Sequence, residues 1–312
     1  MSRLSPHFGR FAALLMALSL AGVGAARGQE GRGPMFDPSR LKWSELSYRA
    51  SKLGLTATSD LEVSTLPAAA VTTMLAEPSE GEPIDARGQS TLQIELVSSM
   101  IKRENTLRMF LDPGDAAALQ RSELQLARKE KNNRFRRLRY TLRGVDSLTR
   151  RPAAGEAEEP HERWSDSSQW YSSFPDSLVD GTRPTEPTAL LYVMGVAELA
   201  SPGDRTEALV FTRGHVMEVE VSVAGRETVR VDYEEVSPAG ARRVEGRVEA
   251  LELFLDGQPL DPQTAERDFE FLGMRGDVRV YLDPETRAPL QVSGRIKHAG
   301  KANVKLRRVV LR

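Results

Sequence analysis

The sequence predicts a mainly β protein: an antiparallel, strongly curved or barrel-like sheet built from two related meander halves, with one buried helix. Three observations support this prediction. Segment 276–312 has the alternation of a three-strand meander, and its opening motif recurs at 107–113. One long apolar segment, 188–199, interrupts a chain that otherwise alternates between apolar and polar residues.

The closing segment, 276–312, has the pattern of a β-meander. Its first strand alternates apolar and polar residues, which is typical of a half-buried strand. Asp283 and Pro284 then break the strand, because Asp accepts local backbone hydrogen bonds and Pro presets the backbone for a turn. We expect two further strands, 290–297 and 302–311, to complete the meander.

The opening of this meander occurs twice. Residues 107–113 read Leu-Arg-Met-Phe-Leu-Asp-Pro and residues 278–284 read Val-Arg-Val-Tyr-Leu-Asp-Pro, so the two copies agree in residue type at each position. In both copies a Leu-Gln pair, a polar turn and a basic strand follow at matching places, which predicts an internal repeat. The alternative is that two unrelated hairpins share the same turn chemistry. The predicted structural turn residues are Asp112, Pro113, Asp283 and Pro284.

The first 26 residues predict a secretion signal. Two arginines precede an apolar run of signal-peptide length, 11–20, and small residues follow it. The run is too short for an ordinary membrane-spanning helix, and an uncleaved anchor is the alternative. Segment 27–40 is rich in Gly and Pro and is expected to be disordered. The expected location is therefore the bacterial periplasm or the outside of the cell.

The rest of the chain, 41–312, is expected to form a single β-rich domain with halves 41–143 and 188–312. The crossover linker, 144–187, holds Pro, Gly, Ser and acidic residues without periodicity, and so long a connection is often a lid or a binding loop. Disordered linkers are poor in aromatic residues, so part of this one should dock, either as a lid over a cavity or as a strap on the sheet. Its aromatic residues are Trp164, Trp170, Tyr171 and Phe174.

The remaining elements follow from local patterns. Pro187 suits a first helical position, and the apolar residues of 188–199 point nearly all round, so this helix must be buried and would plug the hollow of a curved sheet. Its Leu191 and Met194, with the aromatic residues of the linker, are expected to line a site for an apolar ligand. Segments 67–75 and 243–255 leave helix and strand open. We expect strands near 46–50, 55–63, 91–101, 208–212, 216–223 and 228–233, and loops at 78–88 and 256–268.

Few residues suggest catalysis. The chain contains no cysteine, which excludes disulfides, thiolate chemistry and a lipid-attached cysteine. The histidines lie far apart without metal-ligand spacing, and neither a Gly-x-Ser-x-Gly elbow nor a Gly-rich phosphate loop occurs outside the signal. We therefore expect no catalytic residue, no metal and no cofactor. Paired carboxylates acting as acid and base leave no trace in the sequence, so a hydrolase stays possible.

A basic run, 128–143, is the remaining candidate site. On a strand, Leu138 and Tyr140 take one face, and three arginines take the other. That row could contact anionic lipid headgroups or acidic polysaccharide, because Arg presents a fork to phosphate or carboxylate. The alternative is a solvated sheet face balanced by acidic neighbours. The net charge, −1 before and −3 after loss of two arginines in the signal, gives no field that would attract nucleic acid. The three arginines are Arg137, Arg139 and Arg143.

Four features of the chain together suggest a family. They are an early Leu46, Tyr48 and Gly54, the first Asp-Pro turn, the Ala-Leu-Leu-Tyr segment 189–192, and residues 281–290 within the closing segment. In these features the chain, over about 41–311, resembles the bacterial periplasmic family called domain of unknown function 3108. The chain departs from that pattern at Met194-Gly195, where an Arg is expected, and 144–187 and 243–268 match nothing in it. The resemblance implies an envelope protein of curved antiparallel β structure and implies no catalytic residues.

The leading prediction is a non-enzymatic, secreted or periplasmic cell-envelope protein that binds or carries an apolar or amphipathic ligand such as a lipid. The alternative is a structural or assembly factor that binds another envelope protein through a sheet edge or the arginine row. A third is a hydrolase that uses paired carboxylates on envelope polysaccharide. We expect no nucleic-acid partner, and no membrane span after removal of the signal.

Overall fold

The computed structural model describes residues 36–52, 55–100, 103–178, 181–264, 268–296 and 300–312. The predicted signal, 1–26, lies outside the described residues. Residues 31–312 form one compact unit. Residues 36–40, which were expected to be disordered, instead form a short 3-10 turn that Asp37 caps through its carboxylate. The backbone N–H of Phe36 donates to the carbonyl of Gly114, which ties this segment to the first Asp-Pro turn.

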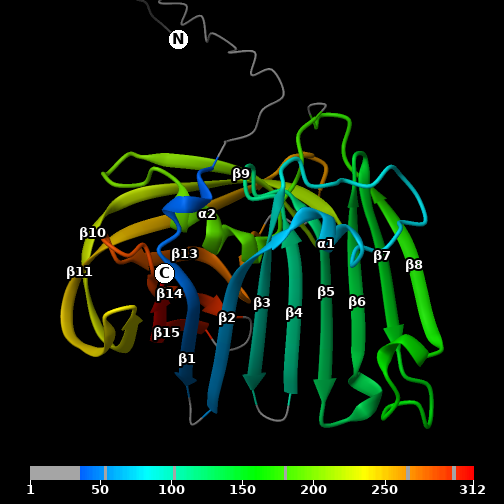
Figure 1. The fold of residues 1–312 in the computed structure, drawn as a ribbon, viewed down its shortest axis with the longest axis horizontal. Coiled ribbons are helices and arrows are strands. Elements are labelled where there is room, and N and C mark those ends of the chain that lie inside the picture. The colour runs from blue at the N-terminus through cyan, green and yellow to red at the C-terminus, as the bar shows by residue number, and fades with distance from the viewer. Residues whose placement is uncertain (1–35, 53–54, 101–102, 179–180, 265–267, 297–299) are drawn as a thin grey trace, which may run out of the picture. The chain divides into compact units, whose positions relative to one another are not determined.

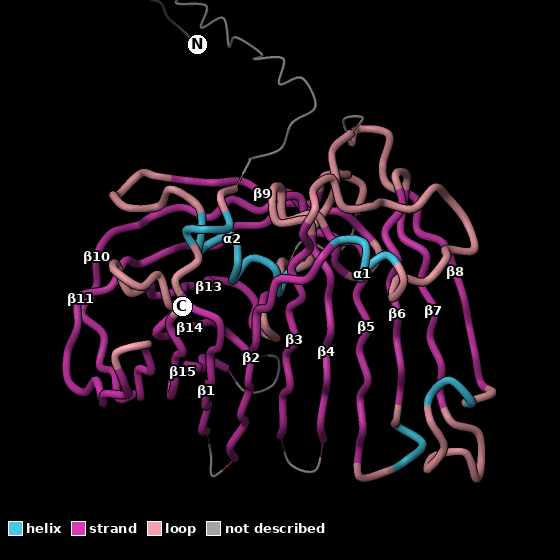
Figure 2. The backbone as a smooth tube through the Cα atoms, viewed as in Figure 1, coloured by secondary structure: helices cyan, strands magenta, loops and turns pink. Residues whose placement is uncertain are grey.

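Strands make up most of the described chain, and the helices are short (Figure 2). The strands are β1 (Trp43–Lys52), β2 (Leu55–Pro67), β3 (Ser90–Met100), β4 (Arg103–Leu111), β5 (Ala118–Ala127), β6 (Arg134–Thr141), β7 (Gly144–Arg151), β8 (Asp166–Ser173), β9 (Arg205–Thr212), β10 (His215–Ser237), β11 (Gly240–Pro259), β12 (Glu270–Phe271), β13 (Met274–Leu282), β14 (Pro289–Ile296) and β15 (Gly300–Leu311). The helical segments are η1 (Pro38–Arg40), α1 (Ala68–Thr72), η2 (Glu130–Asn132), η3 (His161–Arg163), η4 (Pro187–Ala189) and α2 (Leu190–Val196).

The strands form one sheet that closes partly on itself. Strands β1 to β8 lie side by side in chain order (Figure 1), and beyond β1 the order continues through β15, β14, β13, β11, β10 and β9. All these pairs are antiparallel, but β10 also returns to β15, where Glu234–Val236 pair in parallel with Arg308–Val310. Strands β10, β11, β13, β14 and β15 therefore make a closed ring of pairings. The predicted antiparallel, curved or barrel-like sheet is confirmed.

The two Asp-Pro turns of the predicted repeat have the same geometry. The backbone N–H of Asp112 donates to Ala117, and that of Asp283 donates to Ala288, each over 2.9 Å. In both turns the Asp carboxylate accepts the backbone N–H two residues later at 3.0 Å. The fifth residue after the Leu lies at positive φ in both, 57° for Ala116 and 60° for Arg287. Strands β4–β6 and β13–β15 are thus two copies of one meander.

Helix α2 is buried along its whole length, as the apolar sequence predicts. The hydroxyl of Tyr192 donates to the carbonyl of Pro113 in the first Asp-Pro turn, at 2.7 Å. The guanidinium of Arg287, in the second Asp-Pro turn, donates to three carbonyls at the C-terminal end of the helix. These belong to Met194, at 2.9 Å, Ala197, at 3.0 Å, and Leu199. The two repeated turns therefore fix opposite parts of the one buried helix.

The expected crossover linker is wrong in its first part. Residues 144–187 are not structureless, because they contain β7 and β8, which extend the first meander by two strands. The sequence pattern does not predict these strands, because β7 buries the polar residues Asp146 and Ser147 and β8 is mostly exposed, without apolar alternation. Backbone pairing places β8 beside β7, and the side-chain amide of Gln169 donates to the carboxylate of Asp146 across the two strands.

Other boundaries also differ from the expectation. The helix expected over 188–199 begins with η4 and ends at Val196. The ambiguous segment 67–75 contains the short helix α1, whereas 243–255 lies within β11. Strand β11 runs on to Pro259, so the expected loop 256–268 begins four residues too early, because β11 stays paired with β10 up to that residue.

The contact between Arg287 and α2 gives a stability prediction. Replacing Arg287 by Ala keeps a Cβ at the same positive φ, which Ala116 tolerates in the matching turn, but removes the donor to the buried carbonyls. A buried polar group left without a partner costs about 1–3 kcal/mol, so we expect Arg287→Ala to lower the free energy of unfolding by about 3 kcal/mol in urea titrations. The control is Arg307→Ala, which removes a partly exposed ion pair with Asp232 and should cost less than about 1 kcal/mol. Equal losses in the two variants would contradict this account.

Candidate functional site

A cavity of about 590 Å³ lies on the inner face of the sheet, the face that contacts α2. We call it the central cavity. Strands β1–β6 form one wall, and η4, α2, β9 and the segment around Glu270 and Leu272 face them. The lining residues that concern us are Leu61, Leu96, Asn105, Leu107, Arg121, Glu123, Arg134, Arg136, Glu186, Leu191, Phe211 and Leu272.

One cross-strand row shows how the chemistry of this cavity changes from end to end. Leu61, Leu96 and Leu107 are register partners on β2, β3 and β4, and Leu107 continues to Glu123 on β5 and Arg136 on β6. Register partners share one face of a sheet. Along this row the wall is therefore apolar at β2–β4 and charged at β5–β6. A neighbouring row on β2–β4 lines the cavity with the polar residues Ser59, Ser98 and Asn105.

The charged end is built around Arg121 and Glu186. Arg121 donates to Glu123 over 2.7 Å and lies 3.7 Å from a carboxylate oxygen of Glu186. The hydroxyl of Tyr140 also donates to Glu186. Burial raises the pKa of Glu186 above its ordinary value, although Arg121 and Tyr140 oppose the shift. Burial alone would lower the pKa of Arg121, but the two carboxylates raise it.

Arg136 differs from Arg121, because no described residue forms a hydrogen bond or ion pair with it. Its Nε is buried without a hydrogen-bond partner, as is the side-chain oxygen of Asn105. The Nε of Arg121 also makes no hydrogen bond, but it lies in the ion pair with Glu186. The guanidinium carbon lies 5.5 Å from the ring centre of Trp170 on β8. Burial, and then the charge of Arg121, lower the pKa of Arg136. The cavity thus holds a cation and a neutral polar group whose hydrogen-bonding capacity is not used within the described chain.

The residues predicted to bind a ligand do not form a single site. Leu191 lines the central cavity, and Trp170 lies 39 % exposed beside Arg136. Met194 and Trp164 are core residues, the latter donating its indole N–H to the carbonyl of Glu159 at 3.0 Å.

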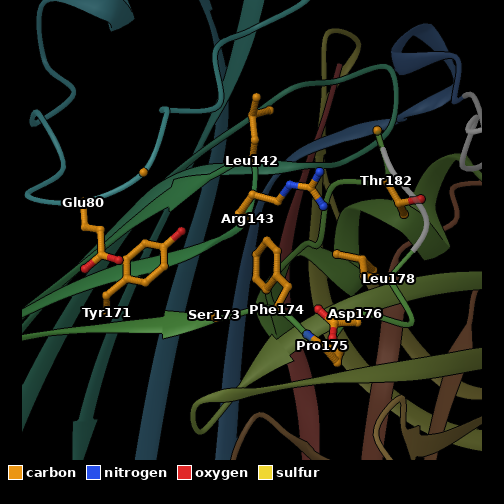
Figure 3. Close-up of a pocket in the computed structure, with 12 residues that line it drawn as sticks. Glu80, Leu142, Arg143, Tyr171, Ser173, Phe174, Pro175, Asp176, Leu178 and Thr182 are labelled. Carbon is orange, nitrogen blue, oxygen red and sulfur yellow. The ribbon is translucent and has the colours of Figure 1, made fainter.

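Tyr171, Phe174 and Arg143 meet in a second, smaller pocket of about 410 Å³, which Figure 3 shows with Phe174 near Arg143 and Tyr171 near Glu80. Tyr171 and Thr141 hydrogen-bond through their hydroxyls at 2.7 Å. Phe174 packs edge-on against Phe211, with ring centres 6.2 Å apart. These aromatic residues therefore line the second pocket, apart from the central cavity, and a ligand-binding role for them stays a prediction.

The three arginines predicted to form an anionic-surface contact do not make one exposed row. Arg139 is only 2 % exposed and donates to the carbonyls of Ala76, Ile84, Leu119 and Tyr140. The loop after α1 covers this face of β6, and the sequence pattern could not show that loop. Arg137 is half-buried on the same face, and Arg143 follows the end of β6 and lines the second pocket.

The sequence analysis missed the charged residues of the central cavity. Arg136, Leu138 and Tyr140 are two residues apart along β6, so they share one face of the strand, opposite to Arg137 and Arg139. The alternation therefore predicts that Arg136 points inward. No sequence pattern indicates Glu186, because only the fold brings the start of η4 against β5 and β6.

Two searches of the described residues for other features found none. No group of three metal-ligating side chains occurs among the described residues. No helix in the described ranges is long and apolar enough to cross a membrane.

No family model matches the chain, and no curated protein matches it. Among solved structures, the chain is similar to a β-barrel-like protein of domain of unknown function 1849 from Brucella abortus, with 11 % identity and a TM-score of 0.41, over 88 % of this chain and 99 % of that one. A similarity at this level carries no argument about function. It concerns a different domain of unknown function from 3108, so membership of the 3108 family stays a prediction.

The environment of Glu186 predicts a pH dependence. Burial raises the pKa of Glu186 in the folded protein above the ordinary 4.5. Protonated Glu186 therefore stabilises the fold at a pH below 4.5, and this stabilisation is lost as the pH rises through the raised pKa. Glu186→Gln keeps an acceptor for Tyr140 but binds no proton. We expect the free energy of unfolding of the wild type, relative to the variant, to fall as pH rises from about 4 to about 8. Urea titrations across that range would test this.

The matched control is Glu285→Gln, which changes an exposed carboxylate in the second Asp-Pro turn. Its effect on the free energy of unfolding should stay small at each pH. A difference between the wild type and Glu186→Gln that does not change with pH would contradict the buried, proton-binding environment of Glu186.

Proposed function

We propose that the protein binds an amphipathic ligand, such as a single-chain lipid, in the central cavity, as a non-enzymatic protein of the periplasm or the cell exterior. The cross-strand row from Leu61 to Arg136 is the observation that supports this proposal. A ligand with an apolar chain and a polar head matches a row that is apolar at one end and charged at the other.

The size and lining of the cavity agree with such a ligand. A volume of about 590 Å³ falls within the range of about 300–1,000 Å³ that is usual for small-molecule sites. The helix α2 fills much of the hollow of the sheet, but it presents Leu191 to the remaining space. Phe211 and Leu272, from the opposite wall, extend the apolar surface.

A blocking substitution tests the proposal. Leu96 is half-buried and faces the central cavity, so Leu96→Trp would place an indole in the space for the chain. The probes are 1-palmitoyl lysophosphatidate and 1-palmitoylglycerol, each below its critical micelle concentration, titrated by calorimetry. We expect the wild type to bind at least one probe in a 1:1 complex, and Leu96→Trp to weaken binding about tenfold, or about 1.4 kcal/mol.

The control for this experiment is Leu126→Trp, because Leu126 is an exposed residue of β5 that does not line the cavity. It should bind like the wild type, and urea titrations would show that both variants fold. The proposal is wrong if the wild type binds neither probe, or if both variants bind equally well.

A second candidate function is a carboxylate-dependent hydrolase, because Glu123 and Glu186 both contact Arg121 in the cavity. Their shared contact places the two carboxyl groups within reach of the spacing that such enzymes use, about 5–10 Å. Arg121 lies between them, however, and pairs with both, which favours the binding role. If the enzyme reading holds, the wild type should release reducing ends from purified envelope polysaccharide, and Glu186→Gln should not. Equal release by the two proteins would exclude it.

A further inference from the structure

The charged end of the central cavity has more positive than negative groups. Arg121, Arg134 and Arg136 line it together with only two carboxylates, Glu123 and Glu186. Both carboxylates make their ion pairs with Arg121, and they attract Arg136 without forming an ion pair with it. The third carboxylate of the cavity, Glu270, pairs at the opposite wall with Arg213 and Arg275.

Arg136 is consequently a half-buried cation without a counter-ion among the described residues. Removing a charge from water without a partner is costly, so such groups are normally paired or hydrogen-bonded. The ring of Trp170 lies within cation–π distance of Arg136 and helps to hold the guanidinium in place. The ring accepts no conventional hydrogen bond from the guanidinium, and the Nε of Arg136 has no hydrogen-bond partner in the described part of the chain.

We propose that the ligand carries an anionic group, a phosphate or a carboxylate, which Arg136 binds at the charged end of the central cavity. This inference rests on the proposed binding function and specifies the class of ligand. A guanidinium edge matches the oxygens of phosphate and carboxylate, and hydrogen bonds between charged groups are the strong ones. The side-chain oxygen of Asn105, which has no hydrogen-bond partner within the described ranges, could accept from a hydroxyl group of the same ligand.

The position of Arg136 also sets the direction of the apolar chain. Arg136 lies on β6, and the leucines of its cross-strand row lie on β4, β3 and β2. Neighbouring strands are about 4.8 Å apart, so the row reaches at most about 19 Å from Arg136 to Leu61. A head bound at Arg136 therefore directs its chain across Glu123 toward the leucines and Leu191.

The test compares three probes by calorimetry: 1-palmitoyl lysophosphatidate, 1-palmitoylglycerol, which has the same chain without charge, and glycerol 3-phosphate, which has the anion without the chain. The test variant is Arg136→Gln. Its matched control is Arg137→Gln, the next residue on the same strand, which is also half-buried with an unpartnered Nε but points to the opposite face of the sheet. Arg136→Lys keeps the charge and serves as the conservative variant.

We expect the wild type to bind lysophosphatidate at least about tenfold more tightly than palmitoylglycerol, because a hydrogen bond to a charged group contributes at least that factor. Arg136→Gln should lose this preference and bind the two lipids with similar affinities. Arg137→Gln should keep the preference, and Arg136→Lys should retain part of it.

Two outcomes would overturn the inference: equal affinity of the wild type for the two lipids, or an unchanged preference in Arg136→Gln. If palmitoylglycerol binds well in the first case, the proposed function stands and only the anionic head is wrong. If neither lipid binds, the proposed function fails as well. If glycerol 3-phosphate binds as tightly as lysophosphatidate, the anion site is supported and the proposed amphipathic ligand is wrong.

Discussion

The fold depends on satisfying the C-terminal carbonyls of a helix that has no contact with water. Helix α2 is wholly buried, and carbonyls at its end find their donor in Arg287, a residue of the second Asp-Pro turn. That turn is itself held to the first strand, because the indole of Trp43 donates to the carbonyl of Arg287 at 3.2 Å. Gly195 makes room for the segment just before that strand, since a Cβ there would lie 2.7 Å from the side chain of Leu41. Fixing α2 in this way also fixes Glu186 and Leu191 beside the cavity.

The inner face of the sheet has an apolar part, beside the buried helix, and a charged part, where the helix begins. Where α2 covers strands directly, the core is apolar and filled. Where the helix begins, at η4, the sheet carries Arg121, Glu123 and Arg136, and the carboxylate of Glu186 enters among them. Buried ionic groups seldom add stability compared with apolar side chains of the same size. Their presence at one end of a cavity is therefore better explained by binding than by folding.

Much of the fold could be read from the chain because alternation and apolar runs report local burial. The repeat of Leu-Asp-Pro predicted two matching turns, and the run after Pro187 predicted the buried helix. Strand β8 could not be read, because it pairs through its backbone and its side chains carry no pattern. Arg136 is expected to point inward because it is two residues from Leu138 and shares its face of the strand, whereas the burial of Arg139 depends on a loop distant in sequence. Alternation gives the face of a strand, but contacts between distant segments decide what covers that face.

The pairing of β15 has a consequence for the order in which the chain can fold. This last strand pairs with β1, with β14 and with β10, so the first and last strands of the sheet are neighbours. Until β15 leaves the ribosome, all three partners present open edges that can pair with other chains. Contacts between residues so distant in sequence also slow folding. Protection of these edges, or delayed folding, would therefore matter until β15 has been made.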